Sequence, residues 1–415
     1  MAAMVKKPVT GMKDILPQEM AVRNYVTSLI RETYASFGFS SIETPAVEHI
    51  ENLLSKQGGE NEKLIFKILK RGEKLDLQNA KTEEDVADSG LRYDLTLPLA
   101  RYYACHAADL PSPFKALQIG NVFRAERNQK GRFRQFTQCD IDILGDPSCF
   151  AEIDLILATS TVLTKLGFKG FRIRINDRAI LKHMAAKAGF QESDFEKVFI
   201  TIDKMDKIGM SGVREDLLAS YPAEIVDSYL EGLGGASSSG DGFSERDEAL
   251  MREVGSPLPE IIRTVMRVKN GDYSVVYDPT LVRGMGYYTG PIFEISMDEF
   301  GSSVGGGGRY DEMIGRFTGQ KTPAVGFSIG FERIIMVLLE KHFEVPGEQD
   351  RAAFLIEKKM PEDRLPAIWQ EAMELRAAGR CVDIAMMKKN RKFQKEQLAA
   401  EGYGEIREFF VNELL

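Results

Sequence analysis

The stretch FRAERNQKGRFRQFTQCDIDILG, residues 123–145, decides the fold of this chain. Apolar, strand-like sequence flanks a short basic segment that contains glycine, a pattern that predicts a β-hairpin. Arginine suits anion binding at such a hairpin, because its planar guanidinium grips phosphate with two hydrogen bonds and stays charged. The basic side chains of the hairpin are Arg124, Arg127, Lys130, Arg132 and Arg134. Charge alone leaves open whether they bind a ligand or form a solvated surface loop.

Three polar residues follow at alternate positions, Gln138, Asp140 and Asp142. The side chains of a strand repeat every two residues, so these three should share one face. They could line a site, or they could be the outward face of an edge strand.

The composition sets broad limits. A length of 415 residues suggests two or three domains, and 43% apolar with 28% charged residues is typical of a soluble globular protein. A net charge of −8 argues against a nonspecific nucleic-acid binder, although a local basic surface could still bind one nucleic acid. We expect no membrane span and no signal peptide, because the long apolar runs that these need are missing. Four scattered cysteines without CxxC spacing argue against zinc and against a disulfide framework, and favour a reducing, cytoplasmic location.

The pattern of apolar residues predicts the order of the elements. An amphipathic helix is expected over 18–37, strands over 64–68 and 75–77, a loop over 79–90 and a helix after Pro98. Over 177–268 the sequence is rich in charged residues and its pattern predicts helices. We interpret this region as an insertion between 1–176 and 269–343. After a linker at 344–350, residues 351–415 alternate as βαβαβ, which predicts a small parallel or mixed sheet covered by helices.

Four separated segments contain polar side chains that could bind a ligand. They are LRYDLTLP (91–98), the hairpin, LVRGMGYYTG (281–290), and GGGGRYD (305–311) with GFSIGFERI (326–334). They predict a pocket with two halves. The cationic half contains Arg124, Arg283 and Arg333, and the acidic and aromatic half contains Asp94, Gln138, Asp142 and Tyr288. A nucleotide and an amino acid fit that description, and the absence of GxxxxGK[ST] excludes a P-loop enzyme.

Each segment also has a simpler interpretation. Tyr287 and Tyr288 could be packing residues, the glycine run 305–308 could be a mobile loop, and Arg333 could form an ordinary surface ion pair with Glu332. Glycines between strand-like segments more often allow a ligand or a second backbone to approach closely.

Taken together, the segments resemble the class II aminoacyl-tRNA synthetases, and among them the histidyl-tRNA synthetase family. GMKDILP (11–17) is similar to the opening of the family, 18–45 to its dimer-forming first motif, 123–136 to its second motif and 323–334 to its third. LVRGMGYYTG and GGGGRYD resemble segments peculiar to the histidine enzymes. The resemblance implies an α+β fold: a class II catalytic core built on an antiparallel sheet, a helical insertion, and a small α/β C-terminal domain that binds the anticodon.

The resemblance also implies residue roles. Arg124 and Arg283 would be catalytic, with Arg283 contacting both the α-phosphate of ATP and the histidine carboxylate. The implied ATP-binding residues are Arg124, Glu126, Arg132, Phe136 and Arg333. The implied histidine-binding residues are Asp94, Thr96, Gln138, Asp142, Arg283, Tyr287 and Tyr288. The implied tRNA acceptor loop contains Asn128, Gln129, Lys130 and Arg134.

The implied activity is ATP-dependent formation of histidyl-adenylate, followed by transfer of histidine to the 3′ end of tRNA(His). ATP is then a substrate, Mg²⁺ accompanies it, no protein-held metal or zinc is expected, and the enzyme is a homodimer. The alternative is a non-catalytic, synthetase-like regulatory subunit of ATP phosphoribosyltransferase. Such proteins typically lack the tail and lose arginines that are present here.

The chain departs from the family pattern in three places. The acidic residues on the histidine side are aspartates where bacterial members often have glutamate, and Gly286 stands where the family often has aspartate. The tail has room for only three strands. Its candidate anticodon contacts are Lys388, Lys389, Arg391 and Lys395.

Overall fold

An eight-stranded, mostly antiparallel sheet forms the centre of the first of two units, Met1–Phe343 and Glu344–Leu415. The computed structural model describes residues 4–54, 64–126, 133–234, 242–283, 287–297, 302–346 and 350–412. The strand order is β1-β5-β6-β11-β10-β9-β7-β8. The strands are β1 (Ser40–Ser41), β5 (Phe114–Phe123), β6 (Gln135–Leu144), β7 (Phe171–Asp177), β8 (Tyr273–Tyr277), β9 (Pro291–Met297), β10 (Ser302–Arg309) and β11 (Ala324–Ile329).

The basic hairpin is confirmed, because β5 and β6 pair in antiparallel register from Phe114 opposite Leu144 to Phe123 opposite Gln135. Strand β6 lies between β5 and β11 in the interior of the sheet. Asp140 and Asp142 are therefore buried, at 4% and 2% exposure, and their interpretation as the outer face of an edge strand is wrong.

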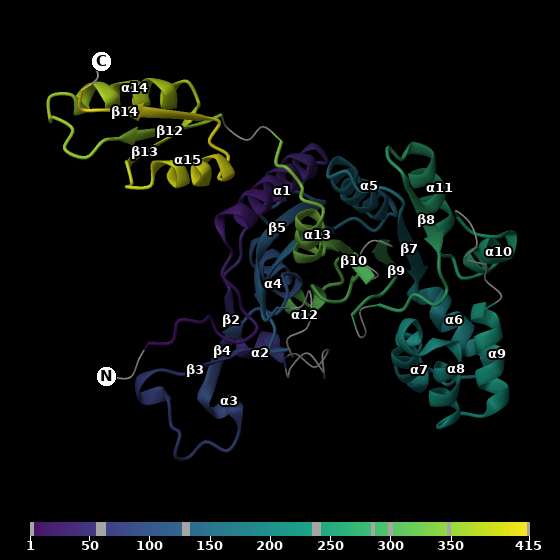
Figure 1. Cartoon of the computed structure of the whole chain (residues 1–415). Helices are drawn as coiled ribbons and strands as arrows, with labels where there is room; N and C mark the ends of the chain where they lie inside the picture. Colours follow the sequence, from purple (N-terminus) through teal and green to yellow (C-terminus); the bar gives the residue numbers. More distant parts are fainter. Residues whose placement is uncertain are drawn as a thin grey trace. The chain divides into compact units, whose positions relative to one another are not determined.

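Long helices cover the sheet (Figure 1). Helix α1 (Pro17–Ser36) packs against both α5 (Phe150–Lys165) and α13 (Phe331–Glu340) over one face. Proline is tolerated at the start of α1 because the first amides of a helix need no partner within it. The face of α1 that carries Val22, Val26 and Ile30 is buried, as the amphipathic pattern predicts.

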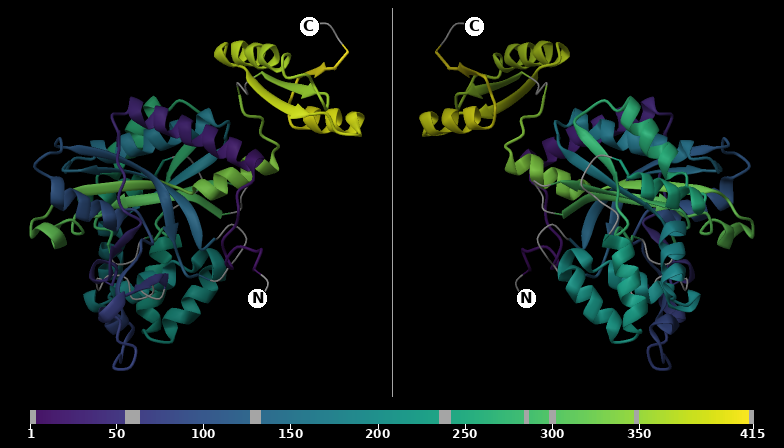
Figure 2. Two further views of the ribbon diagram at one scale, coloured as in Figure 1. Left: turned by 90° about the vertical axis from the view of Figure 1, so that its left-hand side faces the viewer. Right: turned by 90° about the vertical axis from the view of Figure 1, so that its right-hand side faces the viewer.

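The insertion is helical, and its helices α6 to α9 lie beyond the opposite face of the sheet (Figure 2). Its elements are α6 (Arg178–Ala188), the 3₁₀ turn η3 (Glu192–Asp194), α7 (Phe195–Ile202), α8 (Met205–Leu218), α9 (Ala223–Gly234), α10 (Glu245–Glu253) and α11 (Leu258–Val268). Its apolar core includes Phe199 and Tyr229 and continues onto Leu281, Val282 and Ile292 of the sheet unit. This shared core sets the insertion directly beside the segment that leads to the tyrosine pair.

A small antiparallel sheet, β2-β4-β3, completes the unit. Its elements and the short helices near it are β2 (Val47–His49), α2 (Ile50–Leu53), β3 (Lys67–Leu69), the 3₁₀ turn η2 (Gly72–Lys74), α3 (Glu83–Val86), β4 (Ala87–Leu91), α4 (Thr96–His106) and α12 (Gly315–Thr318). The predicted strand at 75–77 and loop at 79–90 are wrong. The true strand, β4, has the sequence ADSGL, whose small residues fit because a Cβ at Gly90 would lie 2.8 Å from Leu53 Cδ1.

Helix α4 begins two residues before Pro98 rather than after it. The Asp94 carboxylate accepts the backbone N–H of Leu97 at 3.2 Å, and proline in a first helical turn removes no helical hydrogen bond.

The second unit has the predicted βαβαβ order, and its three strands are all parallel, in the order β13-β12-β14. Its elements are β12 (Arg351–Ile356), α14 (Leu365–Ala377), β13 (Cys381–Met386), α15 (Arg391–Ala400) and β14 (Glu405–Phe409). Two apolar clusters, one on each face of β12, hold the helices to this sheet. None of the helices among the described residues is long and apolar enough to cross a membrane.

Candidate active site

A cleft of about 1060 Å³ opens over the middle of the large sheet and gathers residues from all four polar segments. The predicted site residues that line it are Asp94, Thr96, Arg124, Glu126, Phe136, Gln138, Asp142, Arg283, Tyr287, Tyr288 and Arg333. They come from β6, from the segments that follow β5 and precede β9, from the start of α4 and the residues before it, and from α13. The fold thus brings together parts of the chain more than 200 residues apart.

Glycines form the floor of this cleft. The run Gly305–Gly308 belongs to strand β10 and is not the mobile loop that its composition also allowed. A Cβ at Gly306 would lie 2.6 Å from Arg283 Nη1, and one at Gly308 would lie 3.0 Å from Tyr288 Cδ1. On the next strand, a Cβ at Gly326 would lie 2.0 Å from Asp142 Oδ1. The glycines therefore leave space in which functional side chains lie flat on the sheet.

The acidic half presents two hydrogen-bond acceptors with no partner among the described residues, Gln138 Oε1 and Asp142 Oδ2. The other oxygen of Asp142 accepts from the Tyr310 hydroxyl at 2.6 Å. The Gln138 amide nitrogen donates to Asp140 at 3.0 Å, and the Ser328 hydroxyl donates to Asp140 at 2.5 Å. A buried acceptor without a partner is costly, so these two oxygens indicate a ligand that donates hydrogen bonds.

Burial also shifts the titration of these groups. It raises the pKa of Asp140 to about 7, and burial and the neighbouring Asp140 charge raise the pKa of Asp142 well above its usual range. Burial raises the pKa of Asp94 as well. A cationic ligand would favour the ionised carboxylates and reverse part of these shifts.

Arg124 and Arg333 also line the cleft. Arg124 Nε donates to the carbonyl of Tyr93 at 2.9 Å, and its guanidinium lies 5.1 Å from the ring centroid of Phe136. Arg333 projects from α13 and donates to the carbonyl of Ser303. Both arginines line the cleft, where their charge would meet an anionic ligand.

Arg283 is a third arginine that lines the cleft. Its Nε donates to Glu294 Oε2 at 2.5 Å and its Nη2 donates to the Ser303 hydroxyl at 2.5 Å. Its Nη1 lies over Gly306, on the floor of the cleft.

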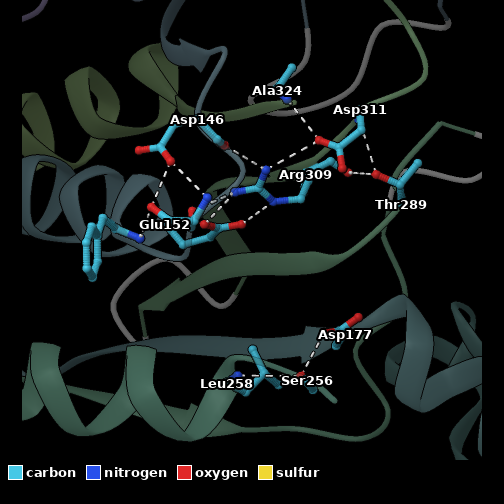
Figure 3. Close-up of polar contacts among 11 residues, drawn as sticks. Asp146, Glu152, Asp177, Ser256, Leu258, Thr289, Arg309, Asp311 and Ala324 are labelled. Carbon is cyan, nitrogen blue, oxygen red and sulfur yellow. Dashed lines mark hydrogen bonds and ion pairs between the residues drawn. The ribbon is translucent and has the colours of Figure 1, made fainter. Parts of the chain in front are cut away.

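A buried ion pair fixes the strand end behind the tyrosines. Figure 3 shows Arg309, the last residue of β10, between Glu152 of α5 and Asp311. The carbonyl of Arg309 accepts the N–H of Thr289 at 2.7 Å, and the Thr289 hydroxyl accepts the N–H of Asp311 at 3.1 Å. Thr289 directly follows Tyr287 and Tyr288, whose ring centroids lie 4.4 Å apart, so these contacts hold the tyrosine turn against the cleft.

Some predicted residues do not line the cleft or cannot be placed. Arg134 is half-buried at the base of the hairpin, where its Nε donates to the carbonyl of Glu126 at 3.1 Å and its side chain packs on Gly11. The residues that lie outside the described part of the chain are Asn128, Gln129, Lys130, Arg132 and Gly286.

The sequence interpretation missed several residues that build the site. Glu332 does not serve mainly as a surface partner of Arg333, because its carboxylate is buried and accepts from Arg23 of α1 at 2.7 and 2.8 Å. Tyr310 belongs to the GGGGRYD segment. Its position directly after Arg309 in that segment was the only hint in the sequence that it contributes to the site. The period of the strand predicts only the face on which Asp140 lies, not its contacts with Gln138 and Ser328.

Comparisons with known proteins show which family this chain is similar to. The family model described as histidyl-tRNA synthetase matches residues 11–334. The histidine–tRNA ligase of Leifsonia xyli is 43% identical over 411 residues, which cover 95% of this chain and 93% of that protein.

Solved structures show the same fold. The histidyl-tRNA synthetase of Nostoc sp. PCC 7120 superposes with a TM-score of 0.75 at 27% identity, over 96% of this chain and 90% of that one. A Bacillus halodurans structure described as an ATP phosphoribosyltransferase regulatory subunit/histidyl-tRNA synthetase has a TM-score of 0.76, over 99% of each chain, but its 20% identity speaks for the fold alone. The match over residues 11–334 and the 43% identity to a relative of nearly equal length lead to one conclusion: the chain belongs to the histidyl-tRNA synthetase family.

Proposed function

We propose that this chain is a histidine–tRNA ligase, which activates L-histidine with ATP and transfers it to the 3′ end of tRNA(His). One observation carries the proposal. Two buried acceptors, Gln138 Oε1 and Asp142 Oδ2, line the same cleft as Arg124, Arg283 and Arg333. An amino acid has a donor end and a carboxylate end, and ATP has phosphates, so the two halves of the cleft match the two substrates.

On the amino-acid side, Gln138 Oε1 would accept from the ammonium group of histidine and Asp142 Oδ2 from the imidazole N–H. Tyr310 holds the other oxygen of Asp142 at 2.6 Å, which fixes the direction in which Oδ2 points. A buried acceptor rejects side chains that cannot donate to it far more strongly than an apolar pocket rejects a change in size. Asp94, Thr96, Tyr287 and Tyr288 would complete the walls around histidine.

On the nucleotide side, Arg124 would hold the α-phosphate, and Phe136 and Arg333 would enclose the adenine ring that Glu126 recognises. Arg132 would contact the outer phosphates. The histidine carboxylate then attacks the α-phosphorus, and the bond to the pyrophosphate oxygen breaks. Such chemistry depends mainly on positioning and on stabilising developing charge, which Arg124 and the Nη1 of Arg283 would provide.

Within the residues that the structure describes, no three His, Cys, Asp or Glu side chains converge on a point that could hold an ion. Mg²⁺ usually keeps several waters and binds through substrate phosphates with one or two carboxylates. We therefore propose that Mg²⁺ accompanies ATP, where it would neutralise phosphate charge.

The remaining assignments concern the larger partners. The loop from Asn128 to Arg134 would meet the acceptor end of tRNA, and the unit Glu344–Leu415 would bind the anticodon through Lys388, Lys389, Arg391 or Lys395. Helix α1 would mediate a homodimer, as its resemblance to the first class II motif suggests. The four free thiols suit a reducing compartment, which we propose is the cytoplasm.

Histidine-dependent ATP–pyrophosphate exchange tests this proposal against the regulatory-subunit alternative. We expect exchange with histidine and none with the other amino acids. Histidine binding without exchange would favour the regulatory subunit, which is disfavoured by the retained arginines Arg124, Arg283 and Arg333 and by the folded tail.

A further inference from the structure

A cross-strand row of five residues, four of them polar, spans the large sheet from β6 to β7. The register places Asp140 of β6 opposite Ser328 of β11, and Ser328 opposite Gly306 of β10. Gly306 is in turn opposite Glu294 of β9, and Glu294 is opposite Arg174 of β7. Residues directly opposite each other on adjacent strands project from the same face. Glu294 and Arg174 therefore belong to the face of the sheet on which the cleft lies.

The Glu294 carboxylate joins two arginines. Its Oε2 accepts from Arg283 Nε at 2.5 Å, and its Oε1 accepts from Arg174 Nη1 at 3.0 Å. Each oxygen thus has its own arginine. Arg174 is held from the other side as well, because its Nε donates to Asp278 Oδ2 at 2.6 Å. The side chains of Glu294, Asp278 and Arg174 are only 13%, 13% and 18% exposed, so solvent screens these contacts weakly.

This division of contacts fixes the direction of the Arg283 guanidinium. Glu294 Oε2 lies 2.5 Å from both Nε and Nη2 of Arg283, and Nη2 also donates to the Ser303 hydroxyl. The remaining nitrogen, Nη1, lies over Gly306 in the cleft. If Arg174 did not hold Oε1, the Glu294 carboxylate could rotate and bring Oε1 as well as Oε2 onto Arg283, the two-oxygen fork geometry that arginine and carboxylate prefer. That rotation would draw the guanidinium away from the reacting groups.

We infer that Glu294 and Arg174 are positioning residues that hold Arg283 with its Nη1 directed at the reaction centre. The inference rests on the proposed function, since it assigns Arg283 to the activation step. Small displacements of a preorganised donor are costly for catalysis, and loss of one such donor typically lowers the rate by about 10²–10³-fold. A displaced donor should cost less, about 10–10²-fold.

Pyrophosphate exchange of Arg174→Met, Arg174→Lys and Glu294→Gln tests the inference, with the thermal unfolding midpoint of each variant measured in parallel. We expect Arg174→Met and Glu294→Gln to lower kcat by about 10–10²-fold, with the KM for ATP within about threefold of wild type. Arg174→Lys should recover part of kcat, because an ammonium can still bind Glu294 Oε1 but has only one point of contact.

Asp206→Asn is the matched control. Asp206 also accepts from Arg174 Nη1, at 3.2 Å, but it is 73% exposed and does not touch Arg283 or Glu294, so kcat should stay within about twofold. Folded variants of Arg174 and Glu294 with wild-type kcat would overturn the inference, as would a loss for Asp206→Asn equal to that of Arg174→Met. A wild-type protein without histidine-dependent exchange would instead refute the proposed function, so the two failures are distinguishable.

Discussion

Arg309 and Glu152 form a buried, two-point ion pair across 157 residues of sequence, with Nε–Oε1 at 2.6 Å and Nη2–Oε2 at 2.8 Å. The pair joins the end of strand β10 to helix α5 behind the tyrosine turn (Figure 3). Removal of one partner leaves the other charge buried without compensation, which typically costs about 3–5 kcal/mol.

Arg309→Met should therefore lower the free energy of unfolding of the first unit by about 3–5 kcal/mol, measured in urea. The double variant Arg309→Met/Glu152→Leu should recover much of this loss, because it leaves no buried charge. The control is Arg252→Met, which breaks an exposed ion pair with Glu248 and should cost under about 1 kcal/mol. Equal losses in the buried and the exposed variant would contradict the structural role of Arg309.

Gly306→Ala tests the glycine floor of the cleft. A Cβ there would lie 2.6 Å from Arg283 Nη1 and 2.9 Å from the carbonyl oxygen of Phe293, so the arginine must move. We expect pyrophosphate exchange to fall by about 10–10²-fold, because Arg283 is displaced rather than lost. Gly404→Ala is the control, because a Cβ at that position meets nothing within 4 Å. A folded Gly306→Ala protein with full activity would show that Arg283 does not act from this position.

The buried carboxylate of Asp140 should make stability depend on pH. Burial raises its pKa from the ordinary 3.8 to about 7, so folding favours the protonated form. The stability that this group contributes is fully present below about pH 4 and is lost as the pH rises through 7. Asp140→Asn stays neutral throughout, and its melting temperature should match wild type at pH 4 and exceed it at pH 8. The surface control Asp88→Asn should leave the dependence of the melting temperature on pH as it is in the wild type. A dependence for Asp140→Asn identical to that of the wild type would refute the raised pKa of Asp140.

Substitution of the imidazole acceptor should affect one substrate only. Asp142→Ala removes the oxygen that we assign to the histidine side chain, so the KM for histidine should rise by about 10²-fold or more, while the KM for ATP stays near wild type. Tyr310→Phe removes only the hydrogen bond that orients Asp142 and should have a smaller effect in the same direction. Steady-state exchange kinetics at varied histidine and varied ATP separate the two constants. A parallel rise in both would place Asp142 outside the histidine site.

Local sequence was sufficient for the elements with regular patterns. The hairpin, the amphipathic helix at the start of the chain and the βαβαβ tail follow from apolar periodicity and from turn residues. Strand β4 was missed because ADSGL has the composition of a turn, and only its neighbours β2 and β3 make it a strand.

The residues of the site were predictable only in part, because local sequence patterns identify some site residues but not the distant residues that orient them. Arg124, Arg283 and Gln138 stand in segments with a recognisable pattern, whereas the contacts that orient them come from far away in the sequence. Tyr310 and Asp142 are 168 residues apart, and Arg23 and Glu332 are 309 apart. Strand register and helix packing create such pairs, and a local sequence pattern predicts neither of them.

Aminoacylation tests the central claim most directly. Purified wild-type protein should transfer labelled histidine to a tRNA(His) transcript in the presence of ATP and Mg²⁺. Arg283→Ala should do so about 10²–10³-fold more slowly, the cost of one preorganised donor. Wild-type protein that leaves the transcript uncharged, or an Arg283→Ala variant that charges it at the wild-type rate, would contradict the account.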